Sequence, residues 1–283
     1  MRALRKKIGP YGIVVPFTIV LAFPFYWMVM TSFKGPNDLY NLDNNPYKFN
    51  QHGQPGGSPT LDNYETLFRD TLFLTWVKNT FVVGGVVVLV TLLLAVPAGY
   101  ALARLTGRWG QTLAIGIFLT YLVPPTLLFL PLSRVISKLN LEDRLWALIL
   151  IYPSFTIPFA TWLMMGFFKT IPRELEDAAM IDGCSRFAAL RRVVLPVSVP
   201  GILTVVIFTF SLCVNEFIYA VTFISSSDHR TISAGVPTDL IRGDLVQWGA
   251  IAASVLIPAI PLALLYNLFL DRFIAGFTGG AFR

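Results

Sequence analysis

Long apolar runs separated by short polar segments dominate this chain. Six runs are long enough to form membrane-spanning helices, since about 20 apolar residues cross the hydrocarbon core of a bilayer. They cover residues 11–32, 77–103, 113–132, 145–168, 197–224 and 249–270. Prolines inside several runs are tolerated in membrane helices, where they mark kinks or backbone that lines a cavity. The pattern predicts an all-α, polytopic membrane protein with six transmembrane helices over residues 11–270.

Composition supports this class. The chain is 55% hydrophobic and only 13% charged, with a mean hydropathy of +0.65, whereas a soluble domain carries about 25% charged residues. Basic residues precede the first run, as in a signal peptide. That run is too long for a signal sequence and no small-residue cleavage site follows it, so we expect an uncleaved first span.

The basic residues are distributed unevenly between the polar segments. If the N-terminus is cytoplasmic, the inner segments hold thirteen of the 22 Lys and Arg residues and five of the 16 Asp and Glu residues. The outer segments then hold nine basic and ten acidic residues. The positive-inside rule therefore predicts that both termini are cytoplasmic. The inner segments are residues 1–10, 104–112, 169–198 and 271–283, and the longest outer segments are residues 33–76 and 225–247.

The first outer segment is expected to be irregular at its centre, which is rich in Asn, Gly and Pro, with a short amphipathic piece beginning at Asp62. The polar insert 171–200 is instead patterned as two short helices. Gly183 suits the C-terminal cap of the first helix, and Ser185 suits the start of a second that stops at Pro196. The second helix carries three apolar side chains on one face: Phe187, Leu190 and Val194. A water-facing helix pair between membrane spans indicates a docking element for a soluble partner.

No motif for catalysis or phosphate binding is present. His52 and His229 fall singly in outer segments, and Cys184 and Cys213 have no metal-binding or disulfide spacing. We therefore expect no catalytic residue, no metal site and two isolated thiols.

Glu216 is the ionisable residue that stands inside an apolar run, directly after Asn215. A carboxylate in a bilayer costs several kcal/mol unless it is paired or hydrated. One interpretation places Glu216 and Asn215 on a water-filled path, where Phe217 and Tyr219 add a stacking face for a polyhydroxylated solute. The other makes Glu216 a partner in an interhelical hydrogen bond, or places it near the outer water layer.

The insert resembles the EAA loop of the permease subunits of ABC importers. The matching positions are Asp177-Ala178-Ala179, Gly183, Val193 and Leu195-Pro196. Wider matches, AGYALARL at 98–105, VNEF at 214–217 and FIAGFTGGAF at 273–282, are similar to the carbohydrate-uptake branch of the maltose-transporter G-subunit type. One departure is that Asp177 replaces the usual glutamate. Glu176 does not substitute for it, because adjacent helix positions point about 100° apart.

This resemblance implies a permease subunit of an ATP-driven importer for a sugar, glycoside or polyol, in a bacterial or archaeal cytoplasmic (inner) membrane. Such a subunit is not an enzyme and binds no cofactor. It forms half of a translocation pathway with a second permease, and an extracytoplasmic binding protein delivers the solute. Two cytoplasmic ATPase subunits hold ATP and Mg and bind the EAA loop. The solute itself, and whether the second permease is a different chain, stay open.

The interpretation of Glu216 and the resemblance together assign residues to three contacts. The ATPase-coupling set is Asp177, Ala178, Ala179, Gly183, Phe187, Leu190, Arg191, Leu195 and Pro196. The substrate-pathway set is Asn215, Glu216, Phe217 and Tyr219, and the binding-protein set is Ser225, Ser226, Ser227 and Asp228. The C-terminal tail, 275–283, resembles tails that touch the ATPase dimer. Alternatives are packing of the apolar loop residues on the permease's own helices, positive-inside bias for the arginines, and a solvated turn at 225–228.

A self-sufficient secondary transporter is the competing hypothesis. It predicts several intramembrane ionisable groups and an internal repeat. Glu216 is nearly alone and no repeat is visible, which argues against it. A membrane-embedded enzyme would need a cluster of His, Asp or Glu at one depth, which the placement of the histidines does not supply.

Overall fold

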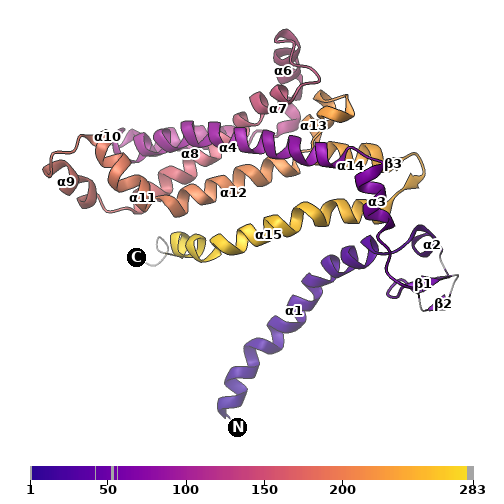
Figure 1. The fold of residues 1–283 in the computed structure, drawn as a ribbon. Helices are drawn as coiled ribbons and strands as arrows, with labels where there is room; N and C mark the ends of the chain where they lie inside the picture. The colour runs from indigo at the N-terminus through magenta and orange to yellow at the C-terminus, as the bar shows by residue number, and fades with distance from the viewer. Residues whose placement is uncertain (1, 42, 52–53, 56, 279–283) are drawn as a thin grey trace. The chain divides into compact units, whose positions relative to one another are not determined.

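The structure is a computed structural model that describes residues 2–41, 43–51, 54–55 and 57–278, and it is mostly helical there (Figure 1). The predicted all-α fold class is confirmed. The chain divides into two compact units. Unit 1 comprises residues 1–73 and 236–261, and unit 2 comprises residues 74–235 and 262–283.

Unit 2 contains the longest series of packed helices. Its helices before the polar insert are α4 (Phe73–Arg104), α5 (Trp109–Tyr121), α6 (Pro125–Lys138), α7 (Leu145–Ile151) and α8 (Pro153–Thr170). After the insert come α12 (Val199–Asn215), α13 (Ile218–Phe223) and α14 (Ile232–Leu240), which runs into unit 1. Helix α8 packs against both α5 and α12. Gly99 lets α4 approach α8 closely, because a Cβ there would lie 2.8 Å from the Cβ of Met164.

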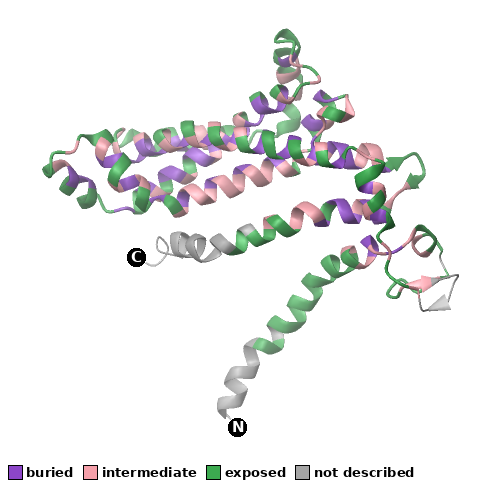
Figure 2. Cartoon of the chain, in the orientation of Figure 1, coloured by how far each residue is buried: buried purple, intermediate pink, exposed green. Residues whose placement is uncertain are grey.

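Two apolar clusters form the core of unit 2. The first surrounds Tyr152 and Tyr219, with side chains from α4, α6, α7, α8 and α13. The second surrounds Met164 and Phe168, with side chains from α4, α5, α8, α12 and the polar insert. Buried residues recur along α8, as Figure 2 shows. The insert is therefore partly built into the core and is not a detached arm.

Three helical stretches of the described residues are long and apolar enough to cross a membrane: Val14–Ser32, Phe73–Arg104 and Leu145–Thr170. Two more candidates are bent pairs. The run predicted over 113–132 is bent, because α5 and α6 meet at 84° where Pro124 and Pro125 interrupt the ladder of backbone hydrogen bonds. The sixth predicted run lies in α15 (Trp248–Thr278), whose apolar part is Trp248–Leu264.

The run predicted over 197–224 is also interrupted. Helix α12 ends at Asn215, Glu216 is extended with φ −72° and ψ 121°, and α13 begins at Ile218. At its other end α12 meets the preceding helical segment, Arg186–Val197, at 73°. The described chain therefore shows up to five spanning candidates when each bent pair counts as one.

Unit 1 contains α1 (Arg2–Ser32), α2 (Pro36–Leu39), β1 (Asn50–Gln51), β2 (Gln54–Pro55) and α3 (Asp62–Arg69). It also contains β3 (Ile241–Arg242), β4 (Leu245–Val246) and the first part of α15. The amphipathic piece predicted from Asp62 is confirmed as α3. The centre predicted as irregular holds the antiparallel pair β1–β2, and the Asp38 carboxylate near the end of α2 accepts a hydrogen bond from the Asn50 N–H (3.0 Å).

Helix α1 exposes its apolar side chains over most of the part whose burial is described (Figure 2). Phe17 and Val20 are 63% and 69% exposed. An exposed apolar surface of this kind requires lipid or another protein around it. Residues 279–283 of the predicted ATPase-touching tail lie outside the described residues, as does His52.

Candidate functional site

The insert 171–200 has the two-helix form that its sequence predicts. Helix α9 (Glu174–Ile181) is followed by Gly183, whose φ of +87° favours glycine. Helix α10 (Arg186–Ala189) is capped by Ser185, whose hydroxyl accepts from the Ala188 N–H at 3.3 Å. The roles predicted for Gly183 and Ser185 are thus confirmed. The second helix was predicted to end at Pro196. In the structure α10 ends earlier, and a π-helical turn (Leu190–Val194) and α11 (Leu195–Val197) then lead past Pro196 into α12.

The predicted ATPase-coupling residues divide into a surface set and a buried set. On the surface are Asp177, Ala178, Gly183, Phe187, Arg191 and Pro196. Ala179 and Leu190 are only 9% and 8% exposed, and Leu195 is partly buried. Leu190 and Val194 belong to the core cluster around Phe168. Their side chains therefore pack on the chain's own helices, whereas the side chain of Phe187 is mostly exposed.

The insert displays exposed apolar side chains, of which Ile181 and Leu175 were not singled out by its sequence pattern. Ile181 is 85% exposed at the end of α9, and Phe187 is 73% exposed at the start of α10. Leu175, at the start of α9, is 42% exposed. Ile181 lies outside the i, i+3, i+7 pattern of the second helix, which is why periodicity missed it.

Glu176 and Asp177 face in different directions, as the 100° rotation between adjacent helix positions predicts. Asp177 is exposed, whereas Glu176 is 7% exposed. The Glu176 carboxylate accepts from Arg104 Nε at 2.6 Å and from the Tyr100 hydroxyl at 2.8 Å. Arg104 also donates through Nη2 to the Ile171 carbonyl at 2.6 Å. The carboxylate beside the EAA position is thus an internal anchor between α9 and α4.

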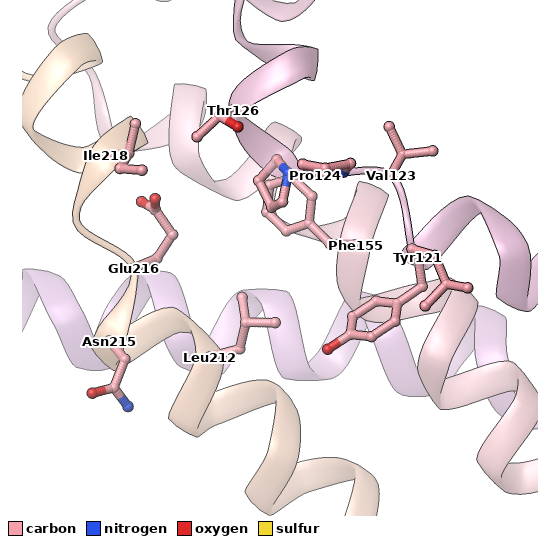
Figure 3. Close-up of a pocket in the computed structure, with 11 residues that line it drawn as sticks. Tyr121, Val123, Pro124, Thr126, Phe155, Leu212, Asn215, Glu216 and Ile218 are labelled. Atoms are coloured by element: carbon pink, nitrogen blue, oxygen red, sulfur yellow. The ribbon is translucent and has the colours of Figure 1, made fainter.

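A cavity of about 540 Å³ lies where helices are interrupted inside two of the predicted apolar runs (Figure 3). One wall is the break between α5 and α6, and the other is the break between α12 and α13. Irregular backbone at membrane depth is tolerated where it lines such a space. The lining residues are Tyr121, Leu122, Val123, Pro124, Pro125, Thr126, Phe155, Leu212, Asn215, Glu216 and Ile218.

Glu216 serves as the N-terminal cap of α13. Its Oε1 accepts from the Tyr219 N–H at 3.0 Å, and its Oε2 accepts from the Ala220 N–H at 3.1 Å. The Tyr152 hydroxyl donates to Oε2 at 2.9 Å. These neutral donors compensate the carboxylate and explain why the helix breaks at this position, since a side chain that binds nearby backbone N–H groups competes with the helical ladder.

The other predicted pathway residues do not share one environment. Asn215 lines the cavity, but its side chain points away from that of Glu216, and its amide donates to the Ser211 carbonyl at 2.7 Å (Figure 3). Tyr219 is fully buried and its hydroxyl donates to the Pro125 carbonyl. Phe217 is 44% exposed and is not among the lining residues.

The aromatic rings at the cavity come from elsewhere in the sequence. Tyr121 and Phe155 line it, and neither belongs to the predicted pathway set. The signal that could have located Tyr121 is the Pro124-Pro125 pair, because a break in a span exposes the residues just before it.

Residues 225–228 are held in place by Asp143, which lies between α6 and α7. Its Oδ1 accepts from the N–H groups of Ser225 and Ser226 at 2.9 Å and 2.8 Å, and its Oδ2 accepts from the Ser226 hydroxyl. These bonds, those of Ser226 above all, hold the pKa of the Asp143 carboxyl below its ordinary value. Trp76 Nε1 donates to the Ser227 carbonyl at 2.7 Å. The segment is therefore an ordered turn.

Within the described part of the chain, no three His, Cys, Asp or Glu side chains are grouped so as to hold a metal ion. Cys184 and Cys213 are free thiols.

Comparison with known proteins gives concordant matches. Residues 95–278 match the family model described as binding-protein-dependent transport system inner membrane component. The chain is 34% identical to the sulfoquinovosyl glycerol transport system permease protein SmoH of Agrobacterium fabrum, over 92% of this chain and 88% of that protein. It is 30% identical to the trehalose/maltose transport system permease protein MalG of Thermococcus litoralis, over 94% and 92%.

A solved structure shares the fold. It is a chain of a bacterial ABC transporter involved in the import of the acidic polysaccharide alginate, with a TM-score of 0.76 and 18% sequence identity. The match covers 95% of this chain and 97% of that chain.

Proposed function

This chain belongs to the family of binding-protein-dependent transport system inner membrane components, and we propose from this premise that it is the permease subunit of an ATP-driven importer for a sugar, glycoside or polyol. The names of two relatives support the solute class, since SmoH and MalG belong to transport systems for sulfoquinovosyl glycerol and for trehalose or maltose. In this proposal the chain forms half of a translocation pathway with a second permease, and a binding protein delivers the solute outside.

The insert 171–200 is the proposed contact for the ATPase subunits, which hold ATP and Mg. The observation that carries this proposal is the exposure of Ile181 and Phe187, at 85% and 73%, on a polar loop that the positive-inside rule assigns to the cytoplasm. Exposed apolar side chains on short helices are typical anchors for a groove in a partner. Gly183 turns the chain between them, and Asp177 supplies an acidic group on the same loop.

The cavity at the two breaks is the proposed part of the pathway that this chain contributes. It combines aromatic faces from Tyr121 and Phe155 with polar groups from Asn215 and Glu216. Sugars are bound through such pairs of surfaces, because C–H faces pack on rings while hydroxyls bond to amides and carboxylates. The ordered turn 225–228 is the proposed contact for the binding protein on the outer side.

Co-purification tests the ATPase contact. The chain is expressed with the ATPase and second permease of its transport system, and Phe187→Ala and Ile181→Ala are compared with Ile241→Ala. The control makes the same kind of truncation at an exposed apolar residue of β3, on the predicted outer side. We expect the first two variants to lose ATPase while Ile241→Ala keeps it. Equal recovery from all three would overturn the proposal.

Vesicle uptake separates the importer from a secondary transporter. Proteoliposomes that hold the complete complex should accumulate radiolabelled trehalose or maltose, offered with the binding protein, when ATP is inside. An ion gradient alone should give no uptake. Uptake by this chain alone on an ion gradient would contradict the proposal and support a secondary transporter.

A further inference from the structure

One arginine joins three parts of unit 2. Arg104 is the last residue of α4, and its Nε donates to Glu176 of α9 at 2.6 Å. Its Nη2 donates at 2.6 Å to the carbonyl of Ile171, the residue that directly follows α8. Both charged side chains are nearly enclosed, with 7% of Arg104 and 10% of Glu176 exposed. The ion pair therefore connects the end of α4 to the end of α8 and to α9.

A tyrosine and a close helix contact extend this connection. The Tyr100 hydroxyl donates to the second oxygen of Glu176 at 2.8 Å, and its ring meets Phe168 of α8 edge-on at 5.8 Å. One residue earlier, Gly99 allows the backbones of α4 and α8 to approach. Interiors packed this closely transmit displacement with little compression. A push on α9 is therefore delivered to α4 and α8 together.

The buried pair is poorly explained as a stabilising device. Taking two charges out of water costs several kcal/mol per ion, and apolar replacements of similar volume are often as stable. An enclosed, three-donor pair does supply a fixed geometry that apolar contacts lack, because charge-assisted hydrogen bonds are directional. Glu176 belongs to α9, the helix that ends at the exposed Ile181, and this position gives that geometry a use.

We propose that the Tyr100–Arg104–Glu176 junction transmits movement of the insert 171–200 to α4 and α8. Arg104 and Glu176 are then positioning residues that couple ATP hydrolysis to solute movement without touching the ATPase or the solute. The proposal rests on the ATPase contact proposed above. It predicts a loss of coupling with assembly preserved, which separates it from a role in docking.

The test compares Glu176→Gln with Glu65→Gln in the complete complex in proteoliposomes. Glu65 pairs with Arg69 on α3 and is exposed, so the control removes the same charge from an open ion pair. Three quantities are measured: ATPase recovered with the chain, ATP hydrolysed, and trehalose or maltose taken up per ATP. We expect Glu176→Gln to retain the ATPase and to hydrolyse ATP, while uptake per ATP falls on the order of tenfold, as expected for loss of a charge-assisted hydrogen bond. Glu65→Gln should match the parent.

Three further variants keep the outcome decisive. Tyr100→Phe leaves the ion pair in place and should lower uptake per ATP, by less than Glu176→Gln does. It still tests the junction if the Glu176→Gln protein cannot be produced. The exchange Arg104→Glu with Glu176→Arg should recover part of the uptake lost in Arg104→Glu alone. Normal uptake per ATP in Glu176→Gln, or loss of the ATPase from it, would overturn the junction. If the parent complex itself retains no ATPase, the proposed docking contact fails first.

Discussion

Glu176 and Glu216 are two carboxylates of unit 2 that solve the same problem differently. Each lies beside a break between helices, and each accepts a hydrogen bond from a tyrosine, Tyr100 or Tyr152. Glu176 is paired with a guanidinium. Glu216 is surrounded by neutral donors, two of them backbone N–H groups of α13. The first arrangement ties separate elements together, whereas the second shapes the chain locally.

The carboxylate that stands out in the sequence is not the one that joins the most elements of the structure. Glu216 stands out in the sequence because it interrupts an apolar run. In the structure its carboxylate caps the N-terminus of α13. Glu176 is one of several charges in a polar insert, and nothing in its local sequence distinguishes it from Glu174 or Asp177. The difference arises from partners 72 and 76 positions away along the chain.

Removing the cation should give the largest effect. Arg104→Ala leaves the Glu176 carboxylate buried without its counter-charge, and breaking such a pair costs about 3–5 kcal/mol of unfolding free energy. The double variant Arg104→Ala with Glu176→Ala should be less destabilised than the sum of the two single variants, because no unpaired charge remains. Unfolding of the purified chain in detergent, followed as a double-mutant cycle, measures this. Additive costs would show that the two charges do not depend on each other.

Removing the cap should cost less. Glu216→Ala leaves two backbone N–H groups and the Tyr152 hydroxyl without their acceptor, which is worth about 1–3 kcal/mol. Glu142→Ala, a substitution of the same kind at an exposed position, is the control and should leave stability unchanged. The same unfolding measurement applies. A cost for Glu216→Ala as large as that for Arg104→Ala would erase the distinction between an ion pair and a cap.

The two tyrosines offer a matched pair of smaller changes. Tyr100→Phe and Tyr152→Phe each delete one hydroxyl that donates to a carboxylate, at 2.8 Å and 2.9 Å. Each should cost about 1–2 kcal/mol. We expect the larger loss of unfolding free energy for Tyr152→Phe. After Tyr100→Phe, Arg104 still compensates the charge of Glu176, whereas the donors left to Glu216 among the described residues are neutral N–H groups. The comparison is reversed if Tyr100→Phe proves the more destabilised variant in the same unfolding assay.

Regular periodicity made the helical class and the two-helix insert predictable. Apolar runs of spanning length follow directly from bilayer thickness, and Gly183 and Ser185 have strong local preferences for a helix end and a helix start. The breaks inside runs were harder to predict. Prolines occur in both straight and bent membrane helices, so the bend at Pro124 depends on what packs around it.

The division of the site residues could not be predicted from spacing alone. Phe187 and Leu190 share one face of an ideal α-helix, yet the first is 73% exposed and the second 8% exposed. The π-helical turn that begins at Leu190 changes the register of the side chains that follow. Tyr219 and Glu216 were predicted to face one path, but the break between α12 and α13 buries the tyrosine.

The turn that Asp143 holds extends the comparison to a partly exposed carboxylate, where the expected effect is smallest. Hydrogen bonds from Ser226 lower the pKa of Asp143, so the folded turn holds its proton more weakly than the unfolded chain does. Its stabilisation is complete above the ordinary carboxyl pKa of about 4 and is lost as the pH falls through the lower folded value. The measurement is the hydrogen-exchange protection of residues 225–230 in the parent, divided by that in Asp143→Asn at the same pH. We expect this ratio to exceed one from pH 5 to 7. That ratio should approach one in more acid solution, and a ratio independent of pH would show that the charge of Asp143 does not order the turn.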